Sequence, residues 1–248
     1  MVAKGHGWEL REGKWQDVLS DVETCDVICT DPPYSERTHA GQRHGRRLND
    51  TSRGSSASWV TTKALDYIAL ESYELPCWPT GWACIFSDDS QILEWKAVAE
   101  SQGRTTFATL PCVLRGMNVR IGGDGPSNWA VYLNVSRPKS LRTWGTLPGA
   151  YVGSPGRGPD RAKLIPGAKP LWLMRAIIRD YSRPGDLIVD PYAGSGTTLL
   201  AAVIEGRRAI GAELDPKTFE LAANRLRSGF TPDMFRGEGK RMKQEDLI

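Results

Sequence analysis

The run LIVDPYAGSGTT at residues 187–198 links an apolar stretch to a helical one through a glycine-rich turn. Its first three residues are apolar and partly β-branched, which is typical of a short buried strand. Gly194 and Gly196 allow the backbone to turn sharply and to approach a ligand closely. Apolar residues recur at helical spacing after Thr198. The run therefore predicts a ligand-binding turn at the carboxyl end of a strand in an open α/β sheet.

A carboxylate follows this turn on the next short strand, Ala209–Ala212, which delivers Glu213. An acid at roughly this distance, about 20 residues past the glycines, suits the diol of a ribose. The third glycine of a nicotinamide fingerprint is missing because Leu199 occupies its position, and the sequence has no Gly-Lys-Ser/Thr of a P-loop. The order of strand, glycine turn, helix, strand and acid therefore indicates a ribose-bearing ligand that is neither a nicotinamide dinucleotide nor the nucleotide of a P-loop protein.

A second turn follows the apolar run 27–29 and reads Asp31-Pro32-Pro33-Tyr34. The prolines end the strand, because neither can donate to a ladder and each fixes its own φ. Asp31 and the carbonyl of Pro32 or Pro33 could accept both hydrogens of an exocyclic amine, and Tyr34 could stack on a base taken out of a duplex. By itself, the tetrapeptide is explained equally well by a surface turn.

Together, the two runs closely resemble the amino-methyltransferases that use S-adenosylmethionine. Residues 31–34 match the catalytic motif of that family, and residues 190–198 match its cofactor motif. Lys169-Pro170 and the helix after it match the element that precedes the cofactor strand. The catalytic motif comes first and the cofactor motif last, an order similar to the permuted beta group of DNA methyltransferases. The resemblance covers most of residues 9–227.

The resemblance implies one Rossmann-like class I methyltransferase domain over residues 1–248. Its α/β fold would have a mostly parallel seven-stranded sheet, helices on both faces and a circularly permuted motif order. The implied cofactor is S-adenosylmethionine, and the implied catalytic residues are Asp31, Pro32, Pro33 and Tyr34. The implied cofactor-binding residues are Asp190, Pro191, Ala193, Gly194, Ser195, Gly196, Thr197, Thr198, Glu213, Lys169, Pro170 and Trp15.

Residues 9–20 resemble the family's motif for the adenine ring, with Gly13-Lys14 where the family often has Gly-Asp. Trp15 or Asp17 would then replace the missing carboxylate contact. The competing interpretation, which we favour for Trp15, is that its indole belongs to the core.

Positive charge is concentrated in two segments, although the whole chain carries a formal charge of only +3. Residues 36–58 form an expected flexible basic loop, and residues 137–168 an expected small basic insert where the family recognises its target. A charged tail is expected at 228–248. Either basic segment is alternatively a solvated loop. The residues expected to contact double-stranded DNA are Arg43, Arg46, Arg47, Arg142, Arg157, Arg161 and Lys163.

The chain of 248 residues is 40% hydrophobic and 25% charged, an ordinary composition for one large α/β domain. It shows no membrane span and no signal peptide, so we expect a nucleoid-associated protein of the bacterial or phage-infected cytoplasm. Its five cysteines are expected to be reduced core thiols. Asp88-Asp89 is expected to cap a helix rather than bind metal, and no metal is expected. The family resemblance also implies that two copies pair as a homodimer.

The predicted function is site-specific methylation of the N6 amine of adenine in duplex DNA by base flipping, as in restriction-modification systems. The sequence shows no nuclease motif and leaves open whether a restriction partner exists. Asp at position 31 favours adenine by resemblance only, so N4-cytosine methylation remains the principal alternative. RNA or protein-amide methylation fits the motif order less well. An inactive DNA-binding homologue is the alternative from another class, and cofactor binding distinguishes it.

Overall fold

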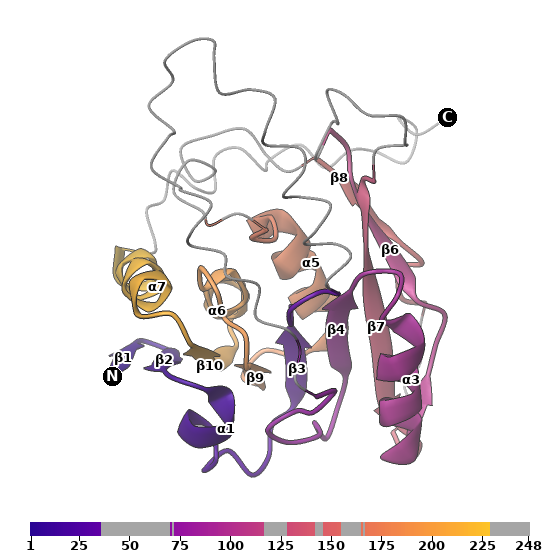
Figure 1. The fold of residues 1–248 in the computed structure, drawn as a ribbon, viewed down its shortest axis with the longest axis horizontal. Helices are drawn as coiled ribbons and strands as arrows, with labels where there is room; N and C mark the ends of the chain where they lie inside the picture. The colour runs from indigo at the N-terminus through magenta and orange to yellow at the C-terminus, as the bar shows by residue number, and fades with distance from the viewer. Residues whose placement is uncertain are drawn as a thin grey trace.

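The computed structural model describes residues 1–35, 70, 72–116, 128–141, 146–154, 165 and 167–228 (Figure 1). These residues build a single sheet with strand order β1-β2-β10-β9-β3-β4-β7-β6-β8, and β5 pairs with β7. The strands, in that order, are β1 (Val2–Gly5), β2 (Trp8–Glu12), β10 (Arg208–Glu213), β9 (Leu187–Asp190), β3 (Val27–Thr30), β4 (Ala83–Ser87), β7 (Ala130–Pro138), β6 (Leu110–Leu114), β8 (Tyr151–Gly153) and β5 (Arg104–Thr106).

The described sheet has ten strands, so the expectation of seven was wrong. The three strands β1, β5 and β8 have only three or four residues each. Segments that short carry no readable alternation of apolar and polar residues, and their pairing with a longer neighbour decides their conformation. Five of the nine strand pairs are parallel. The strand β8 lies inside the expected insert 137–168, yet it pairs with β6 in the main sheet.

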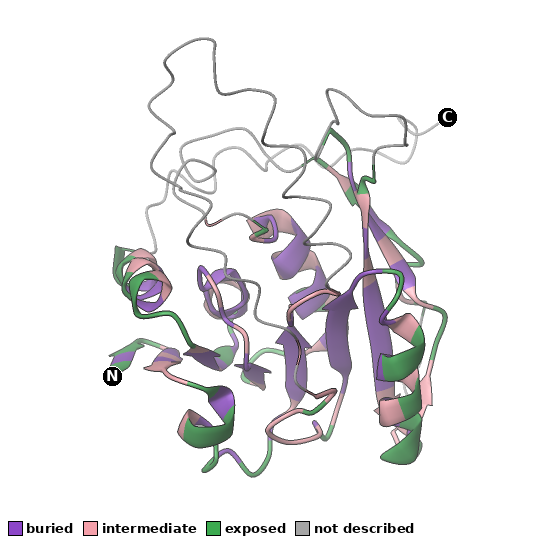
Figure 2. Ribbon diagram, in the orientation of Figure 1, coloured by how far each residue is buried: buried purple, intermediate pink, exposed green. Residues whose placement is uncertain are grey.

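Helices cover both faces of the sheet, as expected (Figure 1). Side chains alternate along each strand. On one face, Val27 and Cys29 of β3 join the core beneath α5 (Leu171–Tyr181), α6 (Thr197–Ile204) and α7 (Pro216–Ser228). On the other face, Ile28 packs with α1 (Trp15–Val18), and β4 packs with α3 (Ile92–Ser101) through Trp95. Figure 2 shows that β3 and β4 are buried along their lengths, whereas α3 exposes its outer side.

The predicted motifs meet because β3 and β9 are parallel neighbours, with Val27 opposite Ile188. The strands β2, β10, β9, β3 and β4 all run in the same direction. Their carboxyl ends therefore lie along one edge of the sheet, where doubly wound sheets bind ligands. The acidic residues Glu12, Glu213, Asp190, Asp31 and Asp88 end or directly follow these five strands.

All five cysteines carry free thiols, and four of them are buried, as expected for core cysteines. No helix in the described part of the chain is long and apolar enough to cross a membrane.

Candidate active site

The glycine turn has the predicted form. Strand β9 ends at Asp190, and α6 begins at Thr197 after Gly196. Gly194 and Gly196 have φ values of +52° and +74°, in the left-handed region that favours glycine. The amide of Ala193 donates to the carbonyl of Ala212 at 2.8 Å, so the turn is fastened to the end of β10.

The carboxylate of Glu213 is held in place by backbone amides on both sides. Its Oε2 accepts a hydrogen bond from Gly194 N at 2.9 Å, and its Oε1 accepts one from Asp215 N at 2.9 Å. Burial raises the pKa of Glu213, and these two backbone hydrogen bonds act against that rise. The acid predicted from its sequence position is therefore oriented at the glycine turn.

Asp190 links the two motifs. Its side chain is 1% exposed, and its Oδ1 accepts hydrogen bonds from Thr30 Oγ1 at 2.7 Å and from Tyr192 N at 3.1 Å. Burial raises the pKa of Asp190 to about 6, against hydrogen bonds from Thr198, Thr30 and Tyr192 that lower it. Asp190 thus ties the residue before Asp31 to the residues that enter the glycine turn.

Asp31 is paired with Lys169, a contact that the sequence did not suggest. Lys169 Nζ donates to Asp31 Oδ2. The lysine side chain is 7% exposed, and that of Asp31 is 28% exposed. The other oxygen, Oδ1, is buried and has no hydrogen-bond partner within the described residues. Burial, followed by the negative charge of Asp31, raises the pKa of the Tyr34 phenol well above its ordinary value.

Two residues that follow β4 hold the Asp31–Ser35 turn, a contact that the sequence did not predict for either of them. Gln91, which is 4% exposed, donates from Nε2 to the carbonyl of Pro33 at 3.1 Å. Asp88 accepts hydrogen bonds from both the amide, at 3.0 Å, and the hydroxyl of Ser35 through Oδ2. Because β4 pairs with β3, residues just after β4 could have been suspected from the rule for carboxyl ends.

Asp88 also accepts hydrogen bonds from Ser90 N at 3.0 Å and Ser90 Oγ at 2.7 Å. It therefore orders the turn that leads into α3, close to the capping role expected from the sequence. Within the described residues, no group of three or more His, Cys, Asp or Glu side chains could hold a metal ion.

Trp15 lies in the core. It is 9% exposed and packs with Leu19 and Ile28 on the α1 face. Its Nε1 donates to the hydroxyl of Tyr192 at 3.0 Å. This placement agrees with the interpretation of Trp15 as a core residue, and we assign it no contact with the cofactor.

The structure brings Asp31, Lys169, Asp190, Glu213 and the glycine turn to one region at the carboxyl ends of β3, β9 and β10. Pro170 directly precedes α5. The expected DNA-binding residues lie outside the described residues, namely Arg43, Arg46, Arg47, Arg142, Arg157, Arg161 and Lys163. So do the whole 36–58 loop and residues 229–248 of the expected tail.

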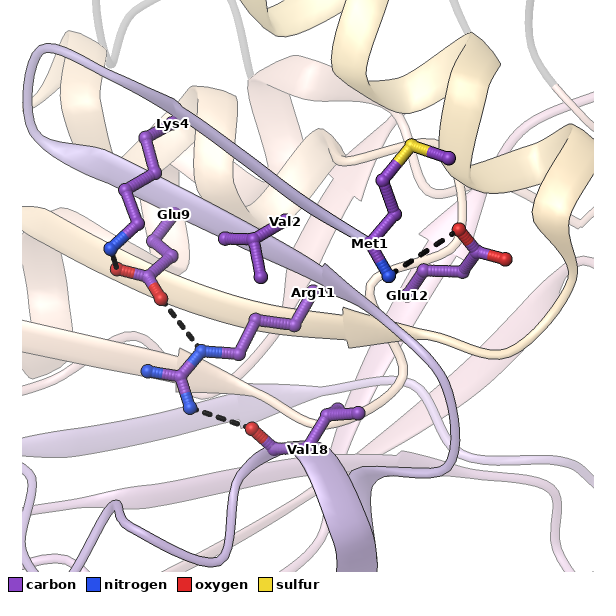
Figure 3. A pocket seen from close by; sticks show the side chains of 7 residues that line it. All are labelled: Met1, Val2, Lys4, Glu9, Arg11, Glu12 and Val18. Carbon is purple, nitrogen blue, oxygen red and sulfur yellow. Dashed lines mark hydrogen bonds and ion pairs between the residues drawn. The ribbon is translucent and has the colours of Figure 1, made fainter.

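A separate hollow of about 360 Å³ lies where β1, β2 and α1 meet. Figure 3 shows the side chains that line it, and the charged ones pair with one another. Glu9 Oε2 lies 2.9 Å from Lys4 Nζ, and Glu9 Oε1 lies 2.7 Å from Arg11 Nε. These mutual pairs leave the hollow without an evident binding group, so the carboxyl edge of the sheet is the candidate site.

The comparisons with known proteins point to DNA methylation. A family model described as "DNA methylase" (N6_N4_Mtase) matches residues 137–224. The DNA adenine methyltransferase YhdJ of Escherichia coli (strain K12) is 41% identical over 67 residues, which cover 27% of this chain and 23% of that protein. The matched segments cover 17–36% of the length of eight curated relatives compared with the chain.

Solved structures share the fold over most of the chain. The M1.HpyAVI–SAM complex has a TM-score of 0.61 and 21% identity, over 88% of this chain and 100% of that one. The cytosine-N4-specific PvuII DNA methyltransferase has a TM-score of 0.54 and 14% identity, over 90% of this chain and 94% of that one. These likenesses confirm the Rossmann-like class I methyltransferase fold.

Proposed function

We propose that this chain is a site-specific DNA methyltransferase of the permuted beta group, which transfers a methyl group from S-adenosylmethionine to the N6 amine of adenine in duplex DNA. The observation that carries the proposal is the direct link between the two motifs: Thr30, next to Asp31, donates to Asp190 at 2.7 Å. The match to the DNA methylase model over residues 137–224 and the likeness to an adenine methyltransferase support it.

The residues at the glycine turn fit S-adenosylmethionine. Two backbone amides orient the Glu213 carboxylate, and a carboxylate oxygen can accept more than one hydrogen bond. Glu213 would therefore hold the ribose diol, while the turn 194–198 lets the backbone come close to the ligand. When bound, the cofactor supplies a methyl group on a positively charged sulfur atom.

Asp31 and Pro32 would orient the amine. An exocyclic amine is a poor nucleophile because its lone pair is delocalised into the ring, and two acceptors for its hydrogens draw the nitrogen towards sp³ geometry. The sequence left open which proline carbonyl takes part. Gln91 donates to the carbonyl of Pro33 and takes one of its two lone pairs; we therefore propose Pro32, rather than Pro33, as the second acceptor. Asp31 also stabilises the positive charge that develops on the nitrogen.

Tyr34 would stack on the extruded base. Its phenol has an ordinary pKa of 10.0, which burial raises further, so it is protonated at physiological pH and the ring carries no charge that would oppose the base. Catalysis then consists mainly of positioning and exclusion of water. Duplex DNA as the substrate and pairing of two copies both rest on resemblance, and each stays a prediction.

Substitution of Asp31 tests this proposal. We expect Asp31→Ala to abolish methylation and to change cofactor affinity, measured by calorimetry, by less than about tenfold. Glu94→Ala is a matched control, because Glu94 is an exposed acid on α3. Near-normal methylation by the Asp31 variant would refute the role of this carboxylate.

Sequencing of genomic DNA from an expressing bacterial host, with reads sensitive to base modification, identifies the base and the site together. N4-methylcytosine would replace our assignment of adenine, and the likeness to the cytosine-N4-specific enzyme keeps that alternative in view. Unmodified DNA together with no cofactor binding would favour an inactive DNA-binding homologue.

A further inference from the structure

One ammonium group contacts both side chains that the proposed function assigns to the target base. Lys169 Nζ donates to Asp31 Oδ2 and lies 5.1 Å from the centroid of the Tyr34 ring. It also lies 5.0 Å from the centroid of the Phe86 ring, and the side chain is 7% exposed. The Lys169 ammonium is therefore buried near two aromatic rings and is paired with the Asp31 carboxylate.

A base in the proposed site would need these same contacts. Its amine would donate to Asp31, as the ammonium does. Stacked aromatic rings have centroids about 4.5–7 Å apart, and the ammonium lies within that range of Tyr34. Asp31 Oδ1 has no hydrogen-bond partner within the described residues, so a base amine could reach the carboxylate beside the ammonium. A base stacked over Tyr34, however, would lie where the ammonium now lies.

We propose that Lys169 holds the place of the target's exocyclic amine, and that a base enters the site only by displacing it. This inference rests on the proposed function for the identity of the substrate. It makes Lys169, which lies just before α5, a residue that limits entry of a base, whereas the family resemblance had assigned it to the cofactor.

The displacement is feasible because the ammonium sits on a flexible four-carbon stem. The backbone at the start of α5 can stay fixed, since Leu173 N and Met174 N both donate to the carbonyl of Pro170. A lysine that has left Asp31 is then available to the cofactor, which is the role that the resemblance gave it.

The competition lowers the affinity for every base by the same factor, so the choice between bases rests on Asp31 once the ammonium has left. Every base that enters must break the charge-assisted hydrogen bond between Lys169 and Asp31. Adenine and cytosine each offer an amine that replaces this bond. Thymine would place a carbonyl oxygen against the carboxylate, so the lost bond would not be replaced and the two oxygens would repel. Such rejection by an unpaired buried charge is a general source of specificity.

The first test compares nucleoside binding by the full chain and its Lys169→Met variant, with saturation-transfer NMR. We expect the variant to bind deoxyadenosine about tenfold more tightly than the parent, since one charge-assisted hydrogen bond no longer has to be broken. Thymidine should gain by about the same factor, because the same hydrogen bond no longer has to be broken. Lys217→Met is the matched control, because Lys217 is an exposed lysine on α7, and it should bind both nucleosides as the parent does.

A double variant separates competition from a change in the shape of the site. Asp31→Ala combined with Lys169→Met should lose the gain in deoxyadenosine affinity, because the carboxylate that receives the amine is gone. A gain that persists in the double variant would contradict the inference.

The second test uses the parent protein and so does not depend on the folding of a variant. The ammonium signal of Lys169 is observed by ¹⁵N–¹H NMR and assigned by its loss in Lys169→Arg. Deoxyadenosine should shift this signal, and thymidine at the same concentration should shift it less.

Three outcomes would overturn the inference: equal or weaker deoxyadenosine binding by folded Lys169→Met, equal shifts of the Lys169 signal by the two nucleosides at the same concentration, or an unmoved Lys169 signal when deoxyadenosine is bound. Each can occur while the parent still methylates DNA, which would leave the proposed function intact. Conversely, unmethylated host DNA would refute the proposed function even if Lys169 competes with nucleosides as described.

Discussion

Asp190 gives the sharpest prediction from the structure, because a buried carboxylate should make stability depend on pH in a calculable way. Its ordinary pKa of 3.8 is raised to about 6, with burial as the largest cause. Below the ordinary value, the carboxyl is protonated in both the folded and the unfolded chain, and its contribution to stability is fully present. Between the two values, the unfolded chain releases the proton more readily, so stability falls as the pH rises.

The size of the effect follows from the two pKa values. One pKa unit corresponds to about 1.36 kcal/mol, so the span from 3.8 to about 6 corresponds to about 3 kcal/mol. Asp190→Asn removes the titration and keeps an oxygen that can accept from Thr30 and Tyr192. Relative to this variant, the parent should therefore lose about 3 kcal/mol of unfolding free energy as the pH rises through about 6.

Urea unfolding of both proteins at pH values from about 4 to about 8 measures this difference. The amide group of the variant also changes the hydrogen bond with Thr198, which shifts the whole difference by a constant amount. Only the dependence on pH tests the argument. Glu94→Gln is a suitable exposed control. If the stabilities of parent and Asp190→Asn ran parallel across this range, the buried carboxylate would not titrate as described.

Three further predictions address the remaining parts of the site. Glu213→Ala should weaken S-adenosylmethionine binding in calorimetry by roughly 1–3 kcal/mol, because buried hydrogen-bonding partners lose their acceptor; unchanged affinity would leave Glu213 as a support for the turn only. Gln91→Met should lower turnover about 10–100-fold with unchanged cofactor affinity, because the Pro33 carbonyl loses its donor and the turn shifts. The control Gln102→Met, at the exposed end of α3, should not lower turnover. Equal turnover in the two variants would exclude a positioning role for Gln91. Neutralising the basic loop should weaken binding to all duplexes alike and flatten the salt dependence of binding. Changes in the insert should instead alter the ratio of target to non-target methylation. Assays with matched and single-mismatch duplexes at two salt concentrations test both, and the reverse pattern would contradict the assignment of sequence recognition to the insert. The substituted residues are Arg43, Arg46 and Arg47 in the loop and Arg157, Arg161 and Lys163 in the insert.

The sequence predicted those parts of the fold that local chemistry determines. The strand–turn–helix at 187–204 depends on apolar strand residues and on glycines in the left-handed region, and both are visible within a few residues. The helices on both faces were also predictable, because the central strands are apolar throughout and must be covered on each side.

The contacts around Asp31 were not predictable from local patterns. Lys169 is 138 positions from Asp31, and Gln91 is 58 positions from Pro33. Nothing near either residue in the sequence indicates its partner, because strand order and side-chain direction bring them together. The short strands β1, β5 and β8 escaped for a related reason: their pairing depends on neighbours, not on their own composition.

The pairing of β3 with β9 also bears on how the chain folds during synthesis. Thr30 and Asp190 are separated by 160 positions, so the central strand pair is a long-range contact of the kind that slows folding. Until residue 190 has left the ribosome, one edge of β3 lacks its partner β9. One edge of β2 likewise stays unpaired until β10 has been synthesised. Those open edges are prone to aggregation. A chain truncated before β9 should therefore accumulate as insoluble protein. We also expect that a fragment carrying only the 31–34 motif or only the 190–198 motif would not fold into an active protein.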